Sequence, residues 1–199
     1  MKKSSKIEVA IFSTTRAEFG LLRPLIKILK KNKKLEVKFF VGGTHVLKDF
    51  GNTINEIKNS KIKIDKIFDY ANNKNDYYSL TQSMSLAVKK LSSIFKKYSF
   101  EILIVLGDRY ELLPIVINAI LYKKIIAHIG GGEATKGLID EQIRNMVTKA
   151  AHLHFTSSEI YSKKILNMGE ESKRIFNVGS LSVDGIKKIK KLSKQEVFK

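Results

Sequence analysis

The sequence contains no cysteine in its 199 residues. This absence excludes disulfide bonds, thiolate metal sites and cysteine nucleophiles, and it leaves the redox compartment open. Any chemistry must therefore come from carboxylates, histidines and cationic side chains.

Arginine is also scarce, which bears on the strongly positive charge. The formal net charge is +18, yet only five of the 37 basic residues are arginine and the rest are lysine. Clustered cations bind nucleic acid by releasing phosphate counterions, whereas base readout and bidentate phosphate contacts favour arginine. The lysines are spread along segments with helical spacing, so a solvated lysine surface is favoured over a nucleic-acid partner.

Long apolar runs are missing as well. No stretch is long enough to span a bilayer, and residues 1–6 lack the apolar segment of a secretory signal. We therefore expect a cytoplasmic protein with no membrane partner. The sequence leaves the oligomeric state open, including a homo-oligomer.

Hydrophobic residues nevertheless make up 43% of the chain, which is enough to bury one full core. We expect one domain over residues 1–186. The basic stretch 187–199 is interpreted as a linker or tail that leads towards a second domain absent from this chain, although an ordinary solvated terminal helix explains it equally well locally.

Short apolar runs rich in β-branched residues alternate with segments of helical spacing. Such runs are typical of buried strands, and the alternation predicts an α/β fold, a Rossmann-like parallel sheet with helices on both faces. Ligands bind such sheets beyond the carboxyl ends of the strands. The expected strands are 7–12, 37–41, 102–106 and 125–129, with weaker ones at 62–68, 153–156 and 175–178; the expected helices are 21–29, 80–95, 112–121, 139–151, 159–168 and 183–192.

The segment 13–16 follows the first expected strand and enters a helix. Its backbone amides and Arg16 can face an anion, which suggests a phosphate site. The alternative is that Ser13 or Thr14 only caps the helix while Arg16 is solvated. The segment has neither the Walker A nor the dinucleotide glycine spacing, so it supports neither ATP hydrolysis nor NAD chemistry.

Glycines at 42 and 43 follow the second strand and permit a sharp turn before His45. His45 could then contact a sugar or phosphate, or it could be a hydrogen-bonded structural residue. Asp108 follows the strand 102–106, beside Arg109 and near Glu111. A carboxylate there either acts on a substrate with Arg109 or caps the next helix with Arg109 as its ion partner.

The stretch 128–144 is the richest in polar candidates. Three successive glycines, 130–132, allow the backbone to lie against a ligand, and Glu133 places a carboxylate at its rim. Asp140 and Arg144 are four residues apart, so on a helix they either pair or meet a polar substrate together. His152 and His154 face one side of a short strand; without a third ligand of clear spacing, we interpret them as structural and predict no metal site.

Taken together, these segments resemble the hydrolysing UDP-N-acetylglucosamine 2-epimerases of the sialic acid and nonulosonic acid branch. The resemblance runs nearly end to end and rests on ordered motifs: STTRAEFGLLRPL at 13–25, GTH at 43–45, FGNT at 50–53, LGDRYE at 106–111, AHI at 127–129, GGE at 131–133, IDEQIR at 139–144, TKAAHLHF at 148–155 and NVGSL at 177–181.

The resemblance implies one half of a glycosyltransferase-B-type two-domain fold, with the active site between two Rossmann-like domains. It implies conversion of UDP-N-acetylglucosamine to N-acetylmannosamine and UDP, by elimination of UDP across C1–C2 and then hydration, without metal or organic cofactor. Because the second domain has no counterpart in this chain, we expect the polypeptide alone to be inactive or very poor.

Site roles follow from the resemblance position by position. Asp108 and Asp140 are implied as acid and base, with Glu133 as a weaker candidate. The implied contacts to the UDP-sugar are Arg16, Gly20, His45, Arg109 and Arg144. We expect Asp108, Asp140 and Arg16 to share one hollow.

Two departures from the family pattern weaken this interpretation. Gly130 stands where the family usually has a polar residue, often a catalytic glutamate, and Asn145 replaces a usual histidine. Alternatives therefore stay open: an epimerase for a diacetamido sugar, a glycosyltransferase of the same architecture, or a non-catalytic module that binds a nucleotide sugar.

Overall fold

The structure, a computed structural model, describes residues 6–51, 53–70, 76–135 and 137–187. Within these residues, seven parallel strands form one sheet in the order β3-β2-β1-β4-β5-β6-β7, which confirms the predicted α/β class. The strands are β1 (Ile7–Ser13), β2 (Leu35–Gly42), β3 (Lys66–Phe68), β4 (Ile102–Leu106), β5 (Ile125–Ile129), β6 (Leu153–Thr156) and β7 (Ile175–Asn177).

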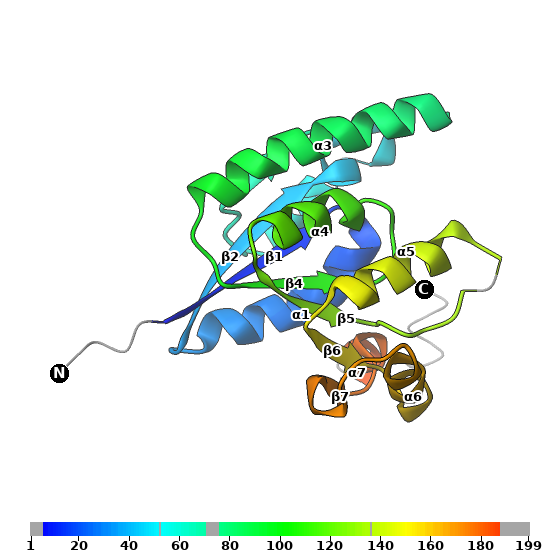
Figure 1. Cartoon of the computed structure of the whole chain (residues 1–199). Coiled ribbons are helices and arrows are strands. Elements are labelled where there is room, and N and C mark those ends of the chain that lie inside the picture. Colours follow the sequence, from blue (N-terminus) through cyan, green and yellow to red (C-terminus); the bar gives the residue numbers. More distant parts are fainter. Residues whose placement is uncertain (1–5, 52, 71–75, 136, 188–199) are drawn as a thin grey trace, which may run out of the picture.

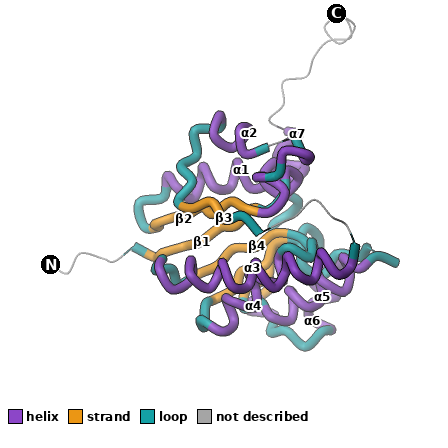
Figure 2. The backbone as a smooth tube through the Cα atoms, turned by 90° about the horizontal axis from the view of Figure 1, so that it is seen from above, coloured by secondary structure: helices purple, strands orange, loops and turns teal. Residues whose placement is uncertain are grey.

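Helices cover both faces of the sheet (Figure 1). Seen from above, α1, α2 and α7 lie on one side and α3, α4, α5 and α6 on the other (Figure 2). These helices are α1 (Arg16–Lys31), α2 (Ile54–Asn59), α3 (Tyr77–Lys97), α4 (Leu112–Leu121), α5 (Ile139–Ala150), α6 (Glu159–Asn167) and α7 (Leu181–Lys187).

The clearest difference from the expected elements lies in residues 62–68, of which only the last three form a strand. The reason is Asp65, whose carboxylate accepts a hydrogen bond of 2.8 Å from the Phe39 amide, in place of a main-chain partner. The short helix α2 was not predicted. The expected last helix is described only as α7, and residues 188–199, which hold most of the expected tail, lie outside the described residues.

The core consists of two layers, because successive strand residues point to opposite faces of the sheet. Ile11 packs towards Ile26 of α1, whereas its neighbour Phe12 packs towards Phe95 of α3. Phe12 also stacks on Phe40, with ring centroids 4.7 Å apart. Each fully buried side chain of this kind stabilises the fold by roughly 1.5–3 kcal/mol, so both helix layers are firmly attached to the strands that carry the site.

The order of the strands determines where a ligand binds. From β1 the chain runs outward to β2 and β3, then crosses back to β4 on the other side of β1. Loops leave β1 and β4 in opposite directions, so a crevice opens beyond their carboxyl ends. The segments after Ser13 and after Leu106 therefore meet at one place.

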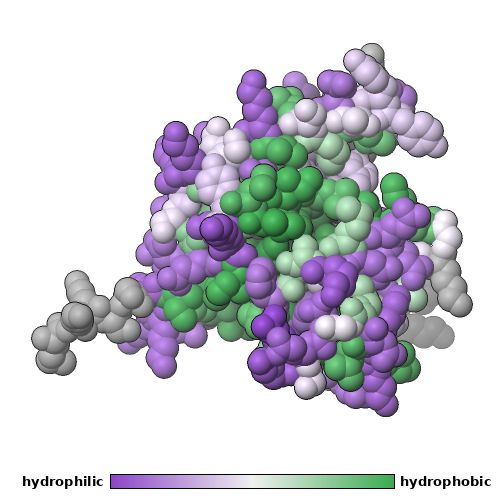
Figure 3. Space-filling view, viewed as in Figure 1, coloured by the Kyte–Doolittle hydropathy of each residue, from purple (hydrophilic) through white to green (hydrophobic). Residues whose placement is uncertain are grey.

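The surface carries apolar as well as basic areas. Figure 3 shows apolar side chains gathered over α4, where Ile117, Ile120 and Leu121 are exposed. Hydrophilic side chains therefore do not cover this face evenly. Among the described residues, no helix is both long and apolar enough to cross a membrane.

The close approach of β2 and β3 gives a test of the packing. A Cβ on Gly42 would lie 2.5 Å from the Phe68 carbonyl oxygen, whereas a Cβ on Gly20, within α1, meets nothing within 4 Å. We expect Gly42→Ala to lower the free energy of unfolding by about 1–3 kcal/mol through overpacking. Gly20→Ala should raise it by about 0.5–1 kcal/mol, because alanine favours the helix. Urea denaturation measures both, and equal effects of the two substitutions would contradict this packing.

Candidate active site

A pocket of about 250 Å³ opens at the crevice between β1 and β4. Four of the expected site residues line it: Asp108, Arg109, Glu133 and Arg144. The wall is completed by Glu18 and Leu21 of α1, by Ser157 after β6, and by residues 179–182 at the start of α7. Segments that follow β1, β4, β5 and β6 thus meet at one edge of the sheet, as the parallel topology requires.

Arg144 holds two of the carboxylates. Its side chain is only 7% exposed; Nη2 pairs with Oδ2 of Asp108, and Nη1 lies 3.9 Å from Oε2 of Glu133. Ser157 donates a hydrogen bond of 2.6 Å to Oε1 of Glu133. Because a buried guanidinium is costly without partners, this network fixes the orientation of both acids. Arg144 pairs with Asp108 and Glu133 rather than with Asp140, the partner suggested by helical spacing.

Arg109 has a different kind of partner. It donates hydrogen bonds of 3.1 and 3.0 Å, from Nε and Nη2, to the carboxylate of Glu111, which is only 2% exposed. The side chain of Arg109 itself is 43% exposed. A guanidinium has five N–H donors, so three remain after these two bonds. Arg109 is therefore anchored at one edge and able to bind an anion at the other.

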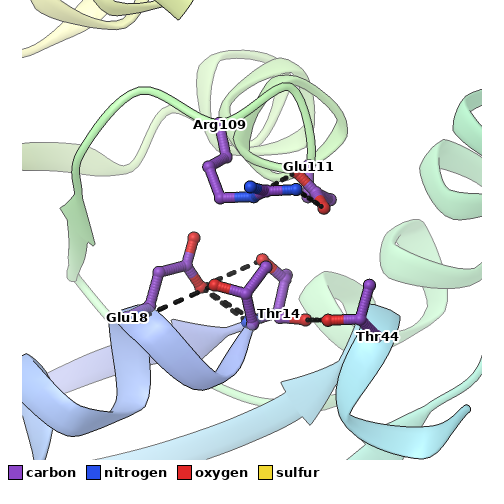
Figure 4. Close-up of polar contacts among 6 residues, drawn as sticks. Thr14, Glu18, Thr44, Arg109 and Glu111 are labelled. Carbon is purple, nitrogen blue, oxygen red and sulfur yellow. Dashed lines mark hydrogen bonds and ion pairs between the residues drawn. The ribbon is translucent and has the colours of Figure 1, made fainter. Parts of the chain in front are cut away.

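Glu18 is a buried carboxyl on the α1 side of the pocket. Its Oε2 accepts hydrogen bonds from the Thr14 amide at 2.7 Å, the Thr14 hydroxyl at 3.0 Å and the Thr15 amide at 3.2 Å. Among the described residues, its Oε1 is buried without a hydrogen-bond partner. Figure 4 shows this oxygen pointing towards Arg109, while Thr44 braces Thr14 from the other side.

The pKa of Glu18 is raised from 4.5 to about 7, because burial and, to a smaller extent, the nearby charge of Glu111 outweigh the opposing hydrogen bonds from Thr14 and Thr15. Thr15 is the N-cap of α1, and it forms a capping box with Glu18. The cap is therefore Thr15, not Ser13 or Thr14 as the alternative interpretation had it. The spacing of Thr15 and Glu18 was the signal in the sequence that could have identified this carboxyl.

Three of the expected ligand contacts lie outside the pocket lining, Arg16 and His45 among them. Arg16 is 74% exposed and pairs with Glu56 of α2 at 3.1 Å. His45 is fully buried, 2.9 Å from the Ser13 hydroxyl and 2.7 Å from the Thr53 hydroxyl. Burial lowers the pKa of His45 to about 4, so its ring is neutral at pH 7. The observed contacts of His45 are those of a structural residue.

Asp140 and Gly20 are also outside the lining. Asp140 is in the first turn of α5, one turn before Arg144, and Gly20 is an exposed residue within α1. Of the three residues expected to share a hollow, Asp108 lines this pocket, whereas Asp140 and Arg16 do not. The expected carboxylates that line the pocket are thus Asp108 and Glu133.

The buried side chain of His128 contacts the turn that lines the pocket. Nε2 of His128 lies 2.8 Å from the Gly107 carbonyl, and Nδ1 lies 3.2 Å from the Thr148 hydroxyl. Burial lowers the pKa of His128 to about 4, so the neutral ring donates from Nε2 to Gly107 and accepts from Thr148. This bond holds the turn that carries Asp108.

His154 is buried 3.4 Å from Glu170, and no group of three or more potential ligands among the described residues is arranged to hold a metal.

Gly130 has a backbone that favours glycine. Its φ is +79°, and an added Cβ would lie 3.9 Å from Oε1 of Glu133 and 4.0 Å from the Gly107 nitrogen. There is room for a side chain beside Glu133, but an L-residue would be strained by about 1–2 kcal/mol. The position where the family often has a catalytic glutamate therefore lies next to the carboxylate of Glu133.

Comparisons with known proteins agree with one another. The family model described as UDP-N-acetylglucosamine 2-epimerase matches residues 27–199. A relative from Campylobacter jejuni, named GDP/UDP-N,N'-diacetylbacillosamine 2-epimerase (hydrolyzing), is 40% identical over 98% of this chain and 50% of its own length. The chain therefore spans about half the length of this curated relative.

Solved structures show the same fold at low identity. A crystal structure of a UDP-N-acetylglucosamine 2-epimerase has a TM-score of 0.83 at 21% identity, over 98% of this chain and 54% of that one. The Neisseria meningitidis UDP-GlcNAc 2-epimerase bound to UDP-GlcNAc has a TM-score of 0.76 at 20% identity, over 91% and 49%. The expected half of a glycosyltransferase-B-type fold is confirmed.

The buried carboxyl of Glu18 predicts a dependence of stability on pH. Unfolded Glu18 releases its proton near pH 4.5, whereas the folded chain keeps it until about pH 7, so unfolding releases a proton in this window. Relative to Glu18→Gln, the wild type should lose on the order of 3 kcal/mol of unfolding free energy as the pH rises through it. Urea denaturation at a series of pH values measures this difference.

Glu8→Gln is the matched control, because hydrogen bonding to Lys38 lowers the pKa of Glu8 instead of raising it. The difference in unfolding free energy between the wild type and Glu8→Gln should therefore not fall as the pH rises through this window. A difference between wild type and Glu18→Gln that does not change with pH would show that Glu18 is ionised in the folded chain throughout.

Proposed function

The chain belongs to the UDP-N-acetylglucosamine 2-epimerase family, and we propose that it supplies the amino-terminal half of the active site of a hydrolysing nucleotide-sugar 2-epimerase. The observation that carries the proposal is the pocket itself. Two carboxylates, Asp108 and Glu133, are held by Arg144 at the carboxyl edge of a parallel sheet, beside a partly exposed Arg109.

The proposed reaction needs proton transfer at a sugar carbon and charge stabilisation at a phosphate. A base removes the proton from C2, the electrons form a C1–C2 double bond, and the bond from C1 to the diphosphate oxygen breaks to release UDP. Water then adds its hydroxyl to C1, and a proton returns to C2 on the opposite face. The products are N-acetylmannosamine and UDP.

Asp108 and Glu133 are the proposed proton-transfer groups of this chain. Both line the pocket, and both are oriented by hydrogen bonds or ion pairs, as general acid–base catalysis requires. The guanidinium of Arg109 is proposed to bind the departing diphosphate, since three of its donors are free of Glu111. No step of this chemistry requires a metal or organic cofactor.

The size of the pocket supports a half-site. Ligand pockets usually enclose about 300–1,000 Å³, whereas this one encloses about 250 Å³. It is therefore suited to part of a nucleotide sugar, and the remainder would need a second domain. Because relatives of this chain are about twice its length, we propose that such a domain completes the site.

A diacetamido sugar is the second candidate substrate. The C. jejuni relative that is 40% identical is named for N,N'-diacetylbacillosamine, whereas a substrate with one acetamido group is the family's namesake. Comparing the affinities of the chain for UDP-N-acetylglucosamine and for the UDP-linked diacetamido sugar would separate the two candidates.

Binding measurements distinguish the arginines that face the pocket from those that do not. Arg109→Gln should weaken binding of UDP-N-acetylglucosamine roughly tenfold, the loss expected for hydrogen bonds to a charged group. Arg16→Gln should change it less than about twofold, because Arg16 points towards Glu56. Isothermal titration calorimetry gives both values; a larger loss from Arg16→Gln would restore the site expected from sequence.

Turnover tests whether the chain is a half-site. The purified 199-residue chain should release no measurable UDP or N-acetylmannosamine from UDP-N-acetylglucosamine, because the proposed facing half of the site is not among these residues. Proton NMR follows substrate and both products directly. Appreciable turnover by the wild type that is lost in Asp108→Asn would show that this chain is catalytically complete.

A further inference from the structure

Of two buried carboxyls on the α1 side of the pocket, one pairs with the guanidinium of Arg109 and the other faces it without an ion pair. Glu111 accepts two hydrogen bonds from Arg109. Glu18 is 6% exposed, and its buried Oε1 has no hydrogen-bond partner among the described residues. Figure 4 shows that oxygen directed at the Arg109 side chain, which lies between the two carboxyls. Arg109 therefore pairs with one buried carboxyl, that of Glu111, and is faced by a second, that of Glu18.

The charge of this cluster depends on one proton. With both carboxyls ionised the cluster has a net charge of −1, and a buried unpaired charge is costly. Glu18 is the group placed to carry the proton, because Thr14 and Thr15 occupy its Oε2 and leave Oε1 free. Burial and the charge of Glu111 both act in this direction and raise the pKa of Glu18 to about 7.

We propose that Glu18 is a positioning residue that acts through Arg109. When Glu18 is protonated, two hydrogen bonds to Glu111 hold the guanidinium of Arg109, and donors on its other side reach an anion in the pocket. When Glu18 is ionised, its free Oε1 attracts the guanidinium into the cluster, and its charge opposes an incoming anion. The inference rests on the proposed function, because the anion it invokes is the diphosphate of the nucleotide sugar.

The tyrosines and histidines around the cluster do not change charge near neutral pH. Burial raises the pKa of both Tyr70 and Tyr110, so these rings stay neutral. Burial lowers the pKa of His45 and of His128 to about 4, so both are neutral as well. On the far wall, Arg144 lies between Asp108 and Glu133.

The test compares anion binding at two pH values. Sulfate and UDP-N-acetylglucosamine are the probes, since neither changes its charge between about pH 6 and about pH 8.5. The 199-residue chain should bind each probe roughly 3–10-fold more weakly at the higher pH, the size of one hydrogen bond or ion pair. Glu18→Gln should bind with the affinity of the wild type at low pH under both conditions, because its amide is uncharged.

Two further variants separate positioning from a structural effect. Glu8→Gln removes a carboxylate at the opposite end of β1, where it pairs with Lys38, and should keep the pH dependence of the wild type. Arg109→Gln should bind weakly at both pH values, and adding Glu18→Gln to it should change nothing further. If Glu18→Gln does not fold, Arg109→Gln provides the test instead. The inference holds if anion binding by Arg109→Gln no longer depends on pH, and it fails if the pH dependence of the wild type remains.

Each remaining outcome is decisive. A pH dependence in Glu18→Gln equal to that of the wild type overturns the inference, as does equal weakening at both pH values. If the chain binds neither probe, the inference is also overturned, because Arg109 then does not bind an anion. Sulfate binding that depends on Glu18, without binding of UDP-N-acetylglucosamine, would retain the inference and reject the proposed function.

Discussion

The reversal of strand order between β1 and β4 is the constraint on which the site depends. Because β2 and β3 extend the sheet on one side of β1 while β4–β7 extend it on the other, the loops at their carboxyl ends part at this point. Asp108, Arg109, Glu133 and Glu18 come from segments far apart in the chain, yet all line the one pocket. The apolar layers on both faces fix the strands that hold these loops.

The pocket has a charge pattern that differs from the rest of the molecule. Two guanidinium groups each lie beside two carboxyls: Arg144 beside Asp108 and Glu133, and Arg109 beside Glu111 and Glu18. The whole chain has a net charge of +18, which attracts an anionic ligand from a distance. Close to the pocket, however, acidic side chains outnumber basic ones, so the local charge differs from that of the whole chain.

This arrangement also gives the departure at position 130 a physical meaning. Gly130 adopts φ +79° and contributes no side chain, while the nearby Glu133 is held by Ser157 and Arg144. A carboxylate is therefore present in this part of the pocket despite the glycine. The proposed chemistry uses Glu133 there, three residues further along the same loop.

The sequence by itself determined the fold class and the edge of the sheet at which the site lies. The strands at 102–106 and 125–129 and the helix at 112–121 coincide with the structure because most of their residues are apolar. Only the tertiary structure decided which polar residues enter the pocket. On α1, Ala17, Glu18 and Leu21 face it while Arg16 faces Glu56, because successive residues of a helix point in different directions around its axis. The Thr15–Glu18 capping box can be read from the sequence. The burial of Glu18 and Glu111 near one arginine depends instead on neighbours that are distant in the chain.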